Sequence, residues 1–374
     1  MSAPRLEIRL DRIGHNARTL VQRLRPLGIT VCGVTKATMG SPEIARELLA
    51  AGVTSLGESR VENIENLRRG GITAPITLVR SPMISQSDRI VANADLSLNS
   101  ELDVINQLSQ SAVEQRTVHG IVLMVELGDL REGIMPGDLH DTVRKVLQLP
   151  GVVLRGIGAN LACQNGVIPD VSNMGELSTL ATSIEATFGL SLDIVSGGNS
   201  ANLQWAFEPD ADVGRINHLR LGESILLGRD PVNRSLLDGL HANAISIVGE
   251  VIESKLKPSQ PRGDRGQTAL GPGIQRRGAQ DRRHRVIVAL GWQDLDVDGI
   301  VPPDGFEILG GSSDHVVLES ALAEPKLGSE LRFMPNYSAL MRSMSSPFVA
   351  QVYFRSHDSQ SRMALVQPYG PQSS

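Results

Sequence analysis

Lys36 stands at the end of an apolar, β-branched segment, 29–35, whose pattern is typical of a buried strand. A lysine amine at the carboxyl end of such a strand is partly desolvated, and desolvation lowers its pKa. The neutral amine is a nucleophile that forms Schiff bases. The alternative is a lysine that leaves the strand and turns into solvent. The choice depends on which groups the ends of the neighbouring strands bring to Lys36.

Further polar segments follow other predicted strands. Arg131 lies in a Gly-x-x-Arg-x-Gly pattern, Asn160 ends a glycine-rich segment, and a Gly-Gly-Asn-Ser turn precedes a helical pattern. The candidate residues of that turn are Gly198, Asn199 and Ser200. Backbone N–H groups and a serine hydroxyl in such a turn can bind a phosphate. A lysine amine together with a phosphate site predicts pyridoxal 5′-phosphate (PLP) as the cofactor.

Arg220 follows in an Arg-x-Gly pattern that ends at Gly222. A surface salt bridge is the ordinary role of an arginine, but at a strand end Arg220 could face the pyridine nitrogen of PLP. A guanidinium stays protonated and would discourage protonation of that nitrogen. The cofactor ring then withdraws electrons less strongly, which favours reversible proton transfer at Cα over transamination.

The elements that would position these residues alternate between short apolar strands and amphipathic helices. The predicted strands are 29–35, 53–57, 75–80, 94–98, 119–126, 152–158, 190–196 and 213–219. Eight strands over about 220 residues predict an α/β fold, a (β/α)8 TIM-type barrel, whose active site lies at the carboxyl ends of the strands. A doubly wound sheet is the competing architecture.

Two domains are expected from 374 residues. Residues 1–242 form the PLP-binding barrel, and 243–374 form a β-rich domain that completes the active site. The opening strand, 6–10, could belong to either domain. A segment rich in proline, glycine and charge, 255–284, is expected to be a long exposed loop.

Composition excludes several classes of function. A net charge of −5 gives no basic surface for nucleic acid. Two cysteines, Cys32 and Cys163, form neither a disulfide framework nor a zinc-type spacing, and no metal is expected. The absence of a membrane-length apolar stretch and of a signal-peptide pattern predicts a soluble cytoplasmic protein.

In combination, these motifs resemble the alanine racemase-like family of fold-type III PLP enzymes. The segments that match are Val34-Thr-Lys36-Ala, Gly128-Asp-Leu-Arg131-Glu-Gly133, Asn199-Ser200-Ala201, Arg220-Leu-Gly222, Gly311-Ser-Ser-Asp314-His315 and Asn336-Tyr337. The resemblance implies that Lys36 carries PLP and that Arg131 handles the cofactor's phenolic oxygen and the substrate carboxylate. It also implies that Asn199, Ser200 and Tyr337 bind the phosphate. Segments such as 57–63 and 217–228 are most similar to the ornithine racemase-like branch.

The chain departs from that family at several positions. Trp292 stands where alanine racemases have the tyrosine that acts as the second base, and tryptophan cannot transfer that proton. His315, Asp314 and Tyr337 are the candidates for this role, in the order in which they titrate near neutrality. Asn160 stands where alanine racemases have a histidine. The resemblance further implies a homodimer in which the β-rich domain of a second subunit completes each site.

The predicted function is therefore a PLP-dependent amino acid racemase, an isomerase acting on ornithine or lysine, or on alanine or serine. A distal ammonium would need an anion, which the acidic run 294–298 or Asp264 could supply unless these residues are simply solvated. The alternatives are a PLP carrier without turnover, a fold-type III decarboxylase and an aldolase that uses Lys36 without PLP. Arg220 disfavours the decarboxylase, and the β-rich domain disfavours the carrier.

Overall fold

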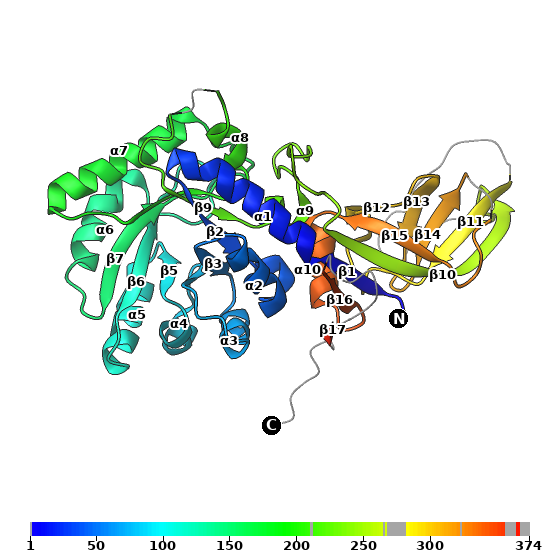
Figure 1. Ribbon diagram of the computed structural model, residues 1–374, viewed down its shortest axis with the longest axis horizontal. Helices are drawn as coiled ribbons and strands as arrows, with labels where there is room; N and C mark the ends of the chain where they lie inside the picture. The colour runs from blue at the N-terminus through cyan, green and yellow to red at the C-terminus, as the bar shows by residue number, and fades with distance from the viewer. Residues whose placement is uncertain are drawn as a thin grey trace. The chain divides into compact units, whose positions relative to one another are not determined.

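The computed structural model describes residues 2–209, 212–264, 266–267, 282–321, 324–355 and 364–366. The chain divides into two compact units (Figure 1). One unit is Arg12–Ala242, and the other combines Met1–Asp11 with Asn243–Ser374.

The first unit is a closed barrel of eight parallel strands, which confirms the predicted architecture. The strands are β2 (Thr30–Val34), β3 (Ser55–Glu58), β4 (Ile76–Leu78), β5 (Leu96–Asn99), β6 (His119–Met124), β7 (Val152–Gly158), β8 (Ile194–Gly198) and β9 (His218–Leu221). Pairing of β2 with β9 closes the barrel and sets Cys32 opposite Arg220. Because all eight strands run in one direction, their carboxyl ends meet at one mouth.

Helices surround this barrel (Figure 1). They are α1 (Leu10–Leu24), α2 (Pro42–Ala50), α3 (Val61–Arg69), α4 (Ser87–Asn93), α5 (Leu102–Glu114), α6 (Leu139–Val146), α7 (Val171–Phe188), α8 (Asn202–Ala206) and α9 (Glu223–Leu227). The start of α2 shows how the local sequence sets a boundary: Ser41 Oγ accepts a hydrogen bond from Ile44 N at 3.4 Å, and Pro42 occupies the first turn. Within the described residues, no helix is long and apolar enough to cross a membrane.

The last two barrel strands begin later than the sequence predicts. Leu192 is buried, but its backbone N–H donates to Glu185 Oε1 in a turn before β8. Ile216 closes a turn with Val213 O before β9. The predicted ranges 190–196 and 213–219 were therefore too early, because apolar residues buried in turns resemble the start of a strand.

The second unit is built around a nine-stranded sheet. Its strands are β1 (Arg5–Arg9), β10 (Ile245–Pro258), β11 (Arg282–Val288), β12 (Ile300–Val301), β13 (Phe306–Gly311), β14 (Val316–Ser320), β15 (Glu330–Pro335), β16 (Ala350–Phe354) and β17 (Ala364–Val366), and it carries the helix α10 (Tyr337–Ser345). The opening strand β1 belongs here: it pairs antiparallel with β10 and parallel with β16. Leu6, Ile8 and Ile247 are fully buried in its core.

The predicted loop 255–284 is too long at both ends. Strand β10 continues to Pro258 and β11 already starts at Arg282, because Lys255 pairs with Arg285 and Pro258 with Arg282. Charged side chains on this exposed hairpin hide the strand pattern in the sequence. The rest of that prediction lies largely outside the described residues, which include only 259–264 and 266–267 between the two strands.

Candidate active site at the mouth of the barrel

Lys36 opens the short 3-10 helix η2 (Lys36–Thr38), two residues beyond the end of β2. Its carbonyl accepts a hydrogen bond from Met39 N, and Met39 adopts a left-handed conformation with φ of 54°. Part of the side chain is exposed, yet the protein around the amine desolvates its charged form and lowers the pKa of Lys36. The charges of Arg131 and Arg220 also lower this pKa, against opposing contributions from Cys163 and Glu58. The lowered pKa increases the fraction of Lys36 in the neutral, nucleophilic form.

Arg220 projects from β9 and is only 4% exposed. Its guanidinium donates to Ala159 O at 2.8 Å, to Asn160 Oδ1 at 3.3 Å and to Ser196 Oγ. Burial lowers the pKa of Arg220 to about 10, so the side chain stays cationic near neutral pH. The structure thus brings Arg220 and Asn160 together, because the strands β9 and β7 end at the same mouth of the barrel.

Ser196 links Arg220 to a second buried group, His218. The Ser196 hydroxyl accepts from Arg220 and lies at hydrogen-bond distance, 2.8 Å, from His218 Nδ1. Burial and the charge of Arg220 lower the pKa of His218 to about 3, which keeps the imidazole neutral. The contact with Ser196 therefore holds the Arg220 guanidinium in place within the barrel.

The turn after β8 is held by hydrogen bonds to the loops on either side. Asn199 Nδ2 donates to Leu161 O at 2.8 Å and to Asn160 Oδ1 at 3.2 Å. The Ser200 hydroxyl accepts from Ser224 N at 3.2 Å and from Gly222 N at 3.4 Å. Gly198 has a φ of 147° and needs glycine, because an added Cβ would lie 2.2 Å from a side-chain oxygen of Asn202.

Arg131 lies in the loop after β6, where its guanidinium forms a salt bridge with Glu132. Glu126 holds the loop backbone by accepting from Leu130 N at 3.0 Å and from Arg131 N at 3.3 Å. Gly133 has a φ of 158°, and a Cβ there would lie 2.5 Å from Glu126 N. The spacing of the Gly-x-x-Arg-x-Gly pattern follows from this tight loop.

Asp129, inside that same pattern, is a site residue that sequence reasoning missed. It is 1% exposed, and its carboxylate accepts from the backbone N–H groups of four residues at 2.9–3.3 Å: Cys163, Gln164, Asn165 and Val167. These bonds outweigh the effect of burial and lower the pKa of Asp129. Asp129 thereby ties the loop after β7, which carries Asn160 and Cys163, to the loop of Arg131.

Glu58, at the end of β3, was also missed. It is 0% exposed and accepts from Thr35 Oγ1 at 3.1 Å, from Asn63 Nδ2 at 3.1 Å and from Ser59 N at 2.8 Å. Desolvation raises its pKa despite these donors. A glutamate directly after an apolar strand was visible in the sequence, but nothing there showed that it turns toward Thr35.

Asp314, His315 and Tyr337 belong to the second unit. His315 O accepts from Ser312 N at 2.8 Å, and its Nδ1 lies 3.3 Å from Ser312 Oγ. Asp314 Oδ2 accepts from Ser313 Oγ at 2.6 Å. Tyr337 opens helix α10, directly after its N-cap residue.

The turn of Trp292 packs against that loop: Trp292 N donates to Ser312 O at 3.0 Å. Asp294, from the acidic run, closes the same turn by accepting from Gly291 N at 2.9 Å and is 8% exposed. Desolvation, together with the charge of Asp314, raises the pKa of Asp294. The structure therefore gathers Trp292, Asp294, Asp314 and His315 into one polar cluster of the second unit.

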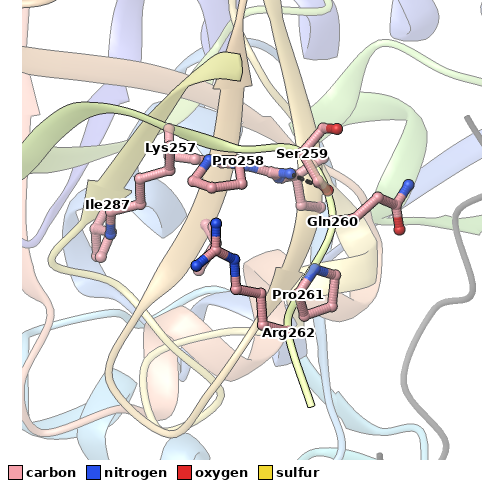
Figure 2. Close-up of a pocket in the computed structure, with 10 residues that line it drawn as sticks. Lys257, Pro258, Ser259, Gln260, Pro261, Arg262 and Ile287 are labelled. Atoms are coloured by element: carbon pink, nitrogen blue, oxygen red, sulfur yellow. Dashed lines mark hydrogen bonds between the residues drawn. The ribbon is translucent and has the colours of Figure 1, made fainter. Parts of the chain in front are cut away.

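A hollow of about 560 Å³ lies elsewhere in the second unit, beside the hairpin of β10 and β11 (Figure 2). Its lining includes Lys257, Arg262 and Arg285 over the apolar side chains of Ile287 and Leu309. None of the predicted site residues lines it. Within the described residues, no group of three or more His, Cys, Asp or Glu is arranged to hold a metal ion.

Comparison with known proteins places the chain in a family. The family model described as alanine racemase, N-terminal domain, matches residues 8–230. A lysine racemase from Thermotoga maritima is 40% identical over 357 residues, which cover 94% of this chain and 99% of the relative. An ornithine racemase from Acetoanaerobium sticklandii is 33% identical over 352 residues, covering 92% of this chain and 98% of the relative.

Solved structures share the fold at low sequence identity. An alanine racemase from Clostridium difficile 630 superposes with a TM-score of 0.73 at 18% identity, with 98% of each chain covered. A D-threonine aldolase from Filomicrobium marinum gives a TM-score of 0.73 at 17% identity, covering 95% of this chain and 92% of the other. These two likenesses show the fold alone.

Proposed function

This chain belongs to the family that carries the alanine racemase N-terminal domain and is an amino acid racemase, and we propose that it uses PLP held by Lys36 and acts on a basic amino acid, lysine or ornithine. The observation that carries the proposal is Lys36 itself, a partly desolvated amine at the barrel mouth with two arginines in electrostatic contact. The substrate class follows from the names of the two relatives that match nearly the whole chain.

The residues at the mouth fit PLP. Asn160 Nδ2 is buried and makes no hydrogen bond within the described part of the chain, so it can donate to a bound acceptor. Arg220 is cationic and fixed for the pyridine nitrogen, and the turn from Gly198 to Ser200, with Gly222, is suited to the phosphate. Arg131 would bind the phenolic oxygen and the substrate carboxylate. When bound, PLP withdraws electrons from Cα and stabilises the carbanion left by proton loss.

Inversion at Cα requires one group to remove a proton from one face and another to deliver a proton to the opposite face. Lys36 Nζ is the proposed base on the first face, and its lowered pKa increases the neutral fraction that can accept the proton. His315 or Asp314 is the proposed group on the second face, because the indole of Trp292 is neither an effective acid nor an effective base near neutral pH. Tyr337 is the proposed phosphate contact from the same unit.

Two further proposals concern assembly and location. We propose that a second copy of the chain supplies its β-rich unit to each site, so that the enzyme is a homodimer with shared active sites. Cytoplasmic localisation stays a prediction from the sequence. Among the acidic residues considered for the distal ammonium, Asp294 closes its own turn, which favours its neighbours Asp296 and Asp298.

The proposal is tested by α-hydrogen exchange in D2O. The PLP-loaded chain is given L-lysine, L-ornithine, L-alanine and L-serine, and loss of the Cα proton signal is followed by NMR. We expect exchange with lysine and ornithine, and Lys36→Ala should reduce the rate by at least about 10²–10⁴-fold because the base is removed. Lys145→Ala, on the outer helix α6, is the control and should exchange normally.

Full exchange by folded Lys36→Ala would refute the role of this lysine. Exchange restricted to alanine and serine would refute the basic substrate class. Silence of the wild-type protein toward all four amino acids would favour the carrier alternative.

A further inference from the structure

Glu58 is a buried carboxylate whose hydrogen bonds, within the described part of the chain, come from neutral donors. These donors include the Thr35 hydroxyl, the Asn63 amide and the backbone N–H of Ser59. Both carboxylate oxygens accept hydrogen bonds, Oε1 from Thr35 and Oε2 from Ser59 N and Asn63. Burying an ionised group with neutral donors nevertheless costs desolvation free energy, which a charge that acts on a reacting group would explain.

Glu58 is linked to Lys36 through Thr35, the residue that precedes Lys36 in the chain. Thr35 is 0% exposed, and its hydroxyl is closer to Glu58 Oε1, at 3.1 Å, than to Gly57 O, at 3.5 Å. Its carbonyl accepts from Thr38 Oγ1 at 2.9 Å and from Gly40 N at 3.3 Å, which closes the turn that presents Lys36. Glu58 thus holds the residue on which this turn is built.

Glu58 also acts on Lys36 through its charge. The groups in electrostatic contact with the amine come from different strands and loops: Glu58 at the end of β3, Arg131 after β6, Cys163 after β7, Arg220 on β9 and Glu223 at the start of α9. The two arginines disfavour the ammonium form, and Glu58 opposes them from a fixed, fully buried position.

We propose that Glu58 is a positioning residue for Lys36, which it serves by anchoring Thr35 and by placing a negative charge near the amine. This inference rests on the proposed role of Lys36 as the reacting lysine. Glu58 touches neither cofactor nor substrate in the proposal; it sets the direction and the proton affinity of the group that does.

The test is Glu58→Gln in the full-length chain, which removes the charge and keeps the shape. The first readout needs no turnover: cofactor-free protein is labelled with an amine reagent across pH, and the Lys36 peptide is quantified by mass spectrometry. We expect the labelling midpoint to move to lower pH, because the ammonium form loses a stabilising charge. In the PLP-loaded enzyme, kcat for lysine should fall about 10–100-fold while KM changes little.

Glu185→Gln is the matched control. Glu185, on α7, is also a bonded carboxylate, accepting from Arg215 and from Leu192 N, but it has no contact with the strand ends near Lys36. In Glu185→Gln, the labelling midpoint of Lys36 and kcat for lysine should both match wild type. If folded Glu58→Gln has the wild-type labelling midpoint for Lys36 and the wild-type kcat, the proposal is overturned.

If Glu58→Gln does not fold, Thr35 provides the second test. Thr35→Ser keeps the hydroxyl that reaches Glu58, whereas Thr35→Val removes it at similar volume. We expect kcat near wild type in the serine variant and about tenfold lower in the valine variant; equal kcat values in the two would refute the anchoring role. A wild-type enzyme without racemisation would refute the proposed function instead, and the labelling midpoint would still decide the role of Glu58.

Discussion

Glu7 and Glu58 are buried carboxylates in the two units of this molecule, and they are held by different kinds of donor. Glu7, on β1, is 9% exposed and accepts from two arginines, Arg5 and Arg332, each at 2.7 Å at its shortest contact. Glu58 is 0% exposed, and within the described residues its hydrogen bonds come from neutral groups such as the Thr35 hydroxyl and the Asn63 amide.

The difference separates a structural network from a functional one. In the β-rich unit, Arg5 and Arg332 both lie beside Val248 of β10, and the network extends to Glu330, so the charges compensate one another across adjacent strands. At the barrel mouth the charges of Arg131, Arg220 and Glu58 all act on Lys36, while the hydrogen bonds described for Glu58 come from neutral groups. A compensated network makes each partner necessary for stability, whereas incompletely compensated charges can tune a reacting group.

The largest expected effect on stability comes from removing the centre of the compensated network. Glu7→Ala leaves the buried Arg5 guanidinium and the neighbouring Arg332 without this carboxylate, which should lower the free energy of unfolding by about 3 kcal/mol. Urea unfolding followed by circular dichroism measures this. A loss below about 1 kcal/mol would mean that Glu330 alone satisfies Arg5.

An effect of intermediate size is expected on the pH dependence of stability, which should have opposite signs for Glu330 and Glu58. The Arg5 hydrogen bond lowers the pKa of Glu330 below 4.5, so its stabilising contribution is present above pH 4.5 and is lost as the pH falls through the lowered value. Desolvation raises the pKa of Glu58 above 4.5, so stability is lost as the pH rises through the raised value.

Unfolding titrations of Glu330→Gln and Glu58→Gln against wild type, repeated between about pH 4 and pH 8, distinguish the two cases. The deficit of Glu330→Gln should shrink toward acid. The stability of Glu58→Gln relative to wild type should improve toward neutral pH. Curves parallel to wild type in both variants would show that neither carboxylate titrates differently in the folded state.

The smallest effect on the free energy of unfolding is expected for an exposed arginine that is paired with two glutamates. Arg89, on α4, pairs with Glu65 at 2.8 Å and with Glu62 at 2.9 Å, but its side chain is 43% exposed. Water screens these charges, so Arg89→Ala should cost less than about 1 kcal/mol. A loss as large as that of Glu7→Ala would show that burial does not set the strength of these networks.

Local sequence determined much of the barrel and the residues at its mouth. Short apolar strands alternating with helices predicted eight strands, and closure placed Lys36, Arg131, Asn160, Ser200 and Arg220 at the carboxyl ends or the loops that follow. Glycines marked the tight loops, since Gly133 and Gly198 have backbone angles that other residues rarely adopt. These features depend on residues close together in the chain.

The tertiary structure alone decided which side chains meet. Thr35 and Glu58 are 23 residues apart, and Asp129 reaches Cys163 N over 34 residues, so neither contact leaves a local pattern. The assignment of β1 to the second unit likewise depends on pairing with β10 and β16, more than 230 residues away along the chain. A sequence specifies the polarity and turn chemistry of each segment, but a hydrogen bond between distant segments exists only once barrel closure or sheet pairing has set their ends side by side.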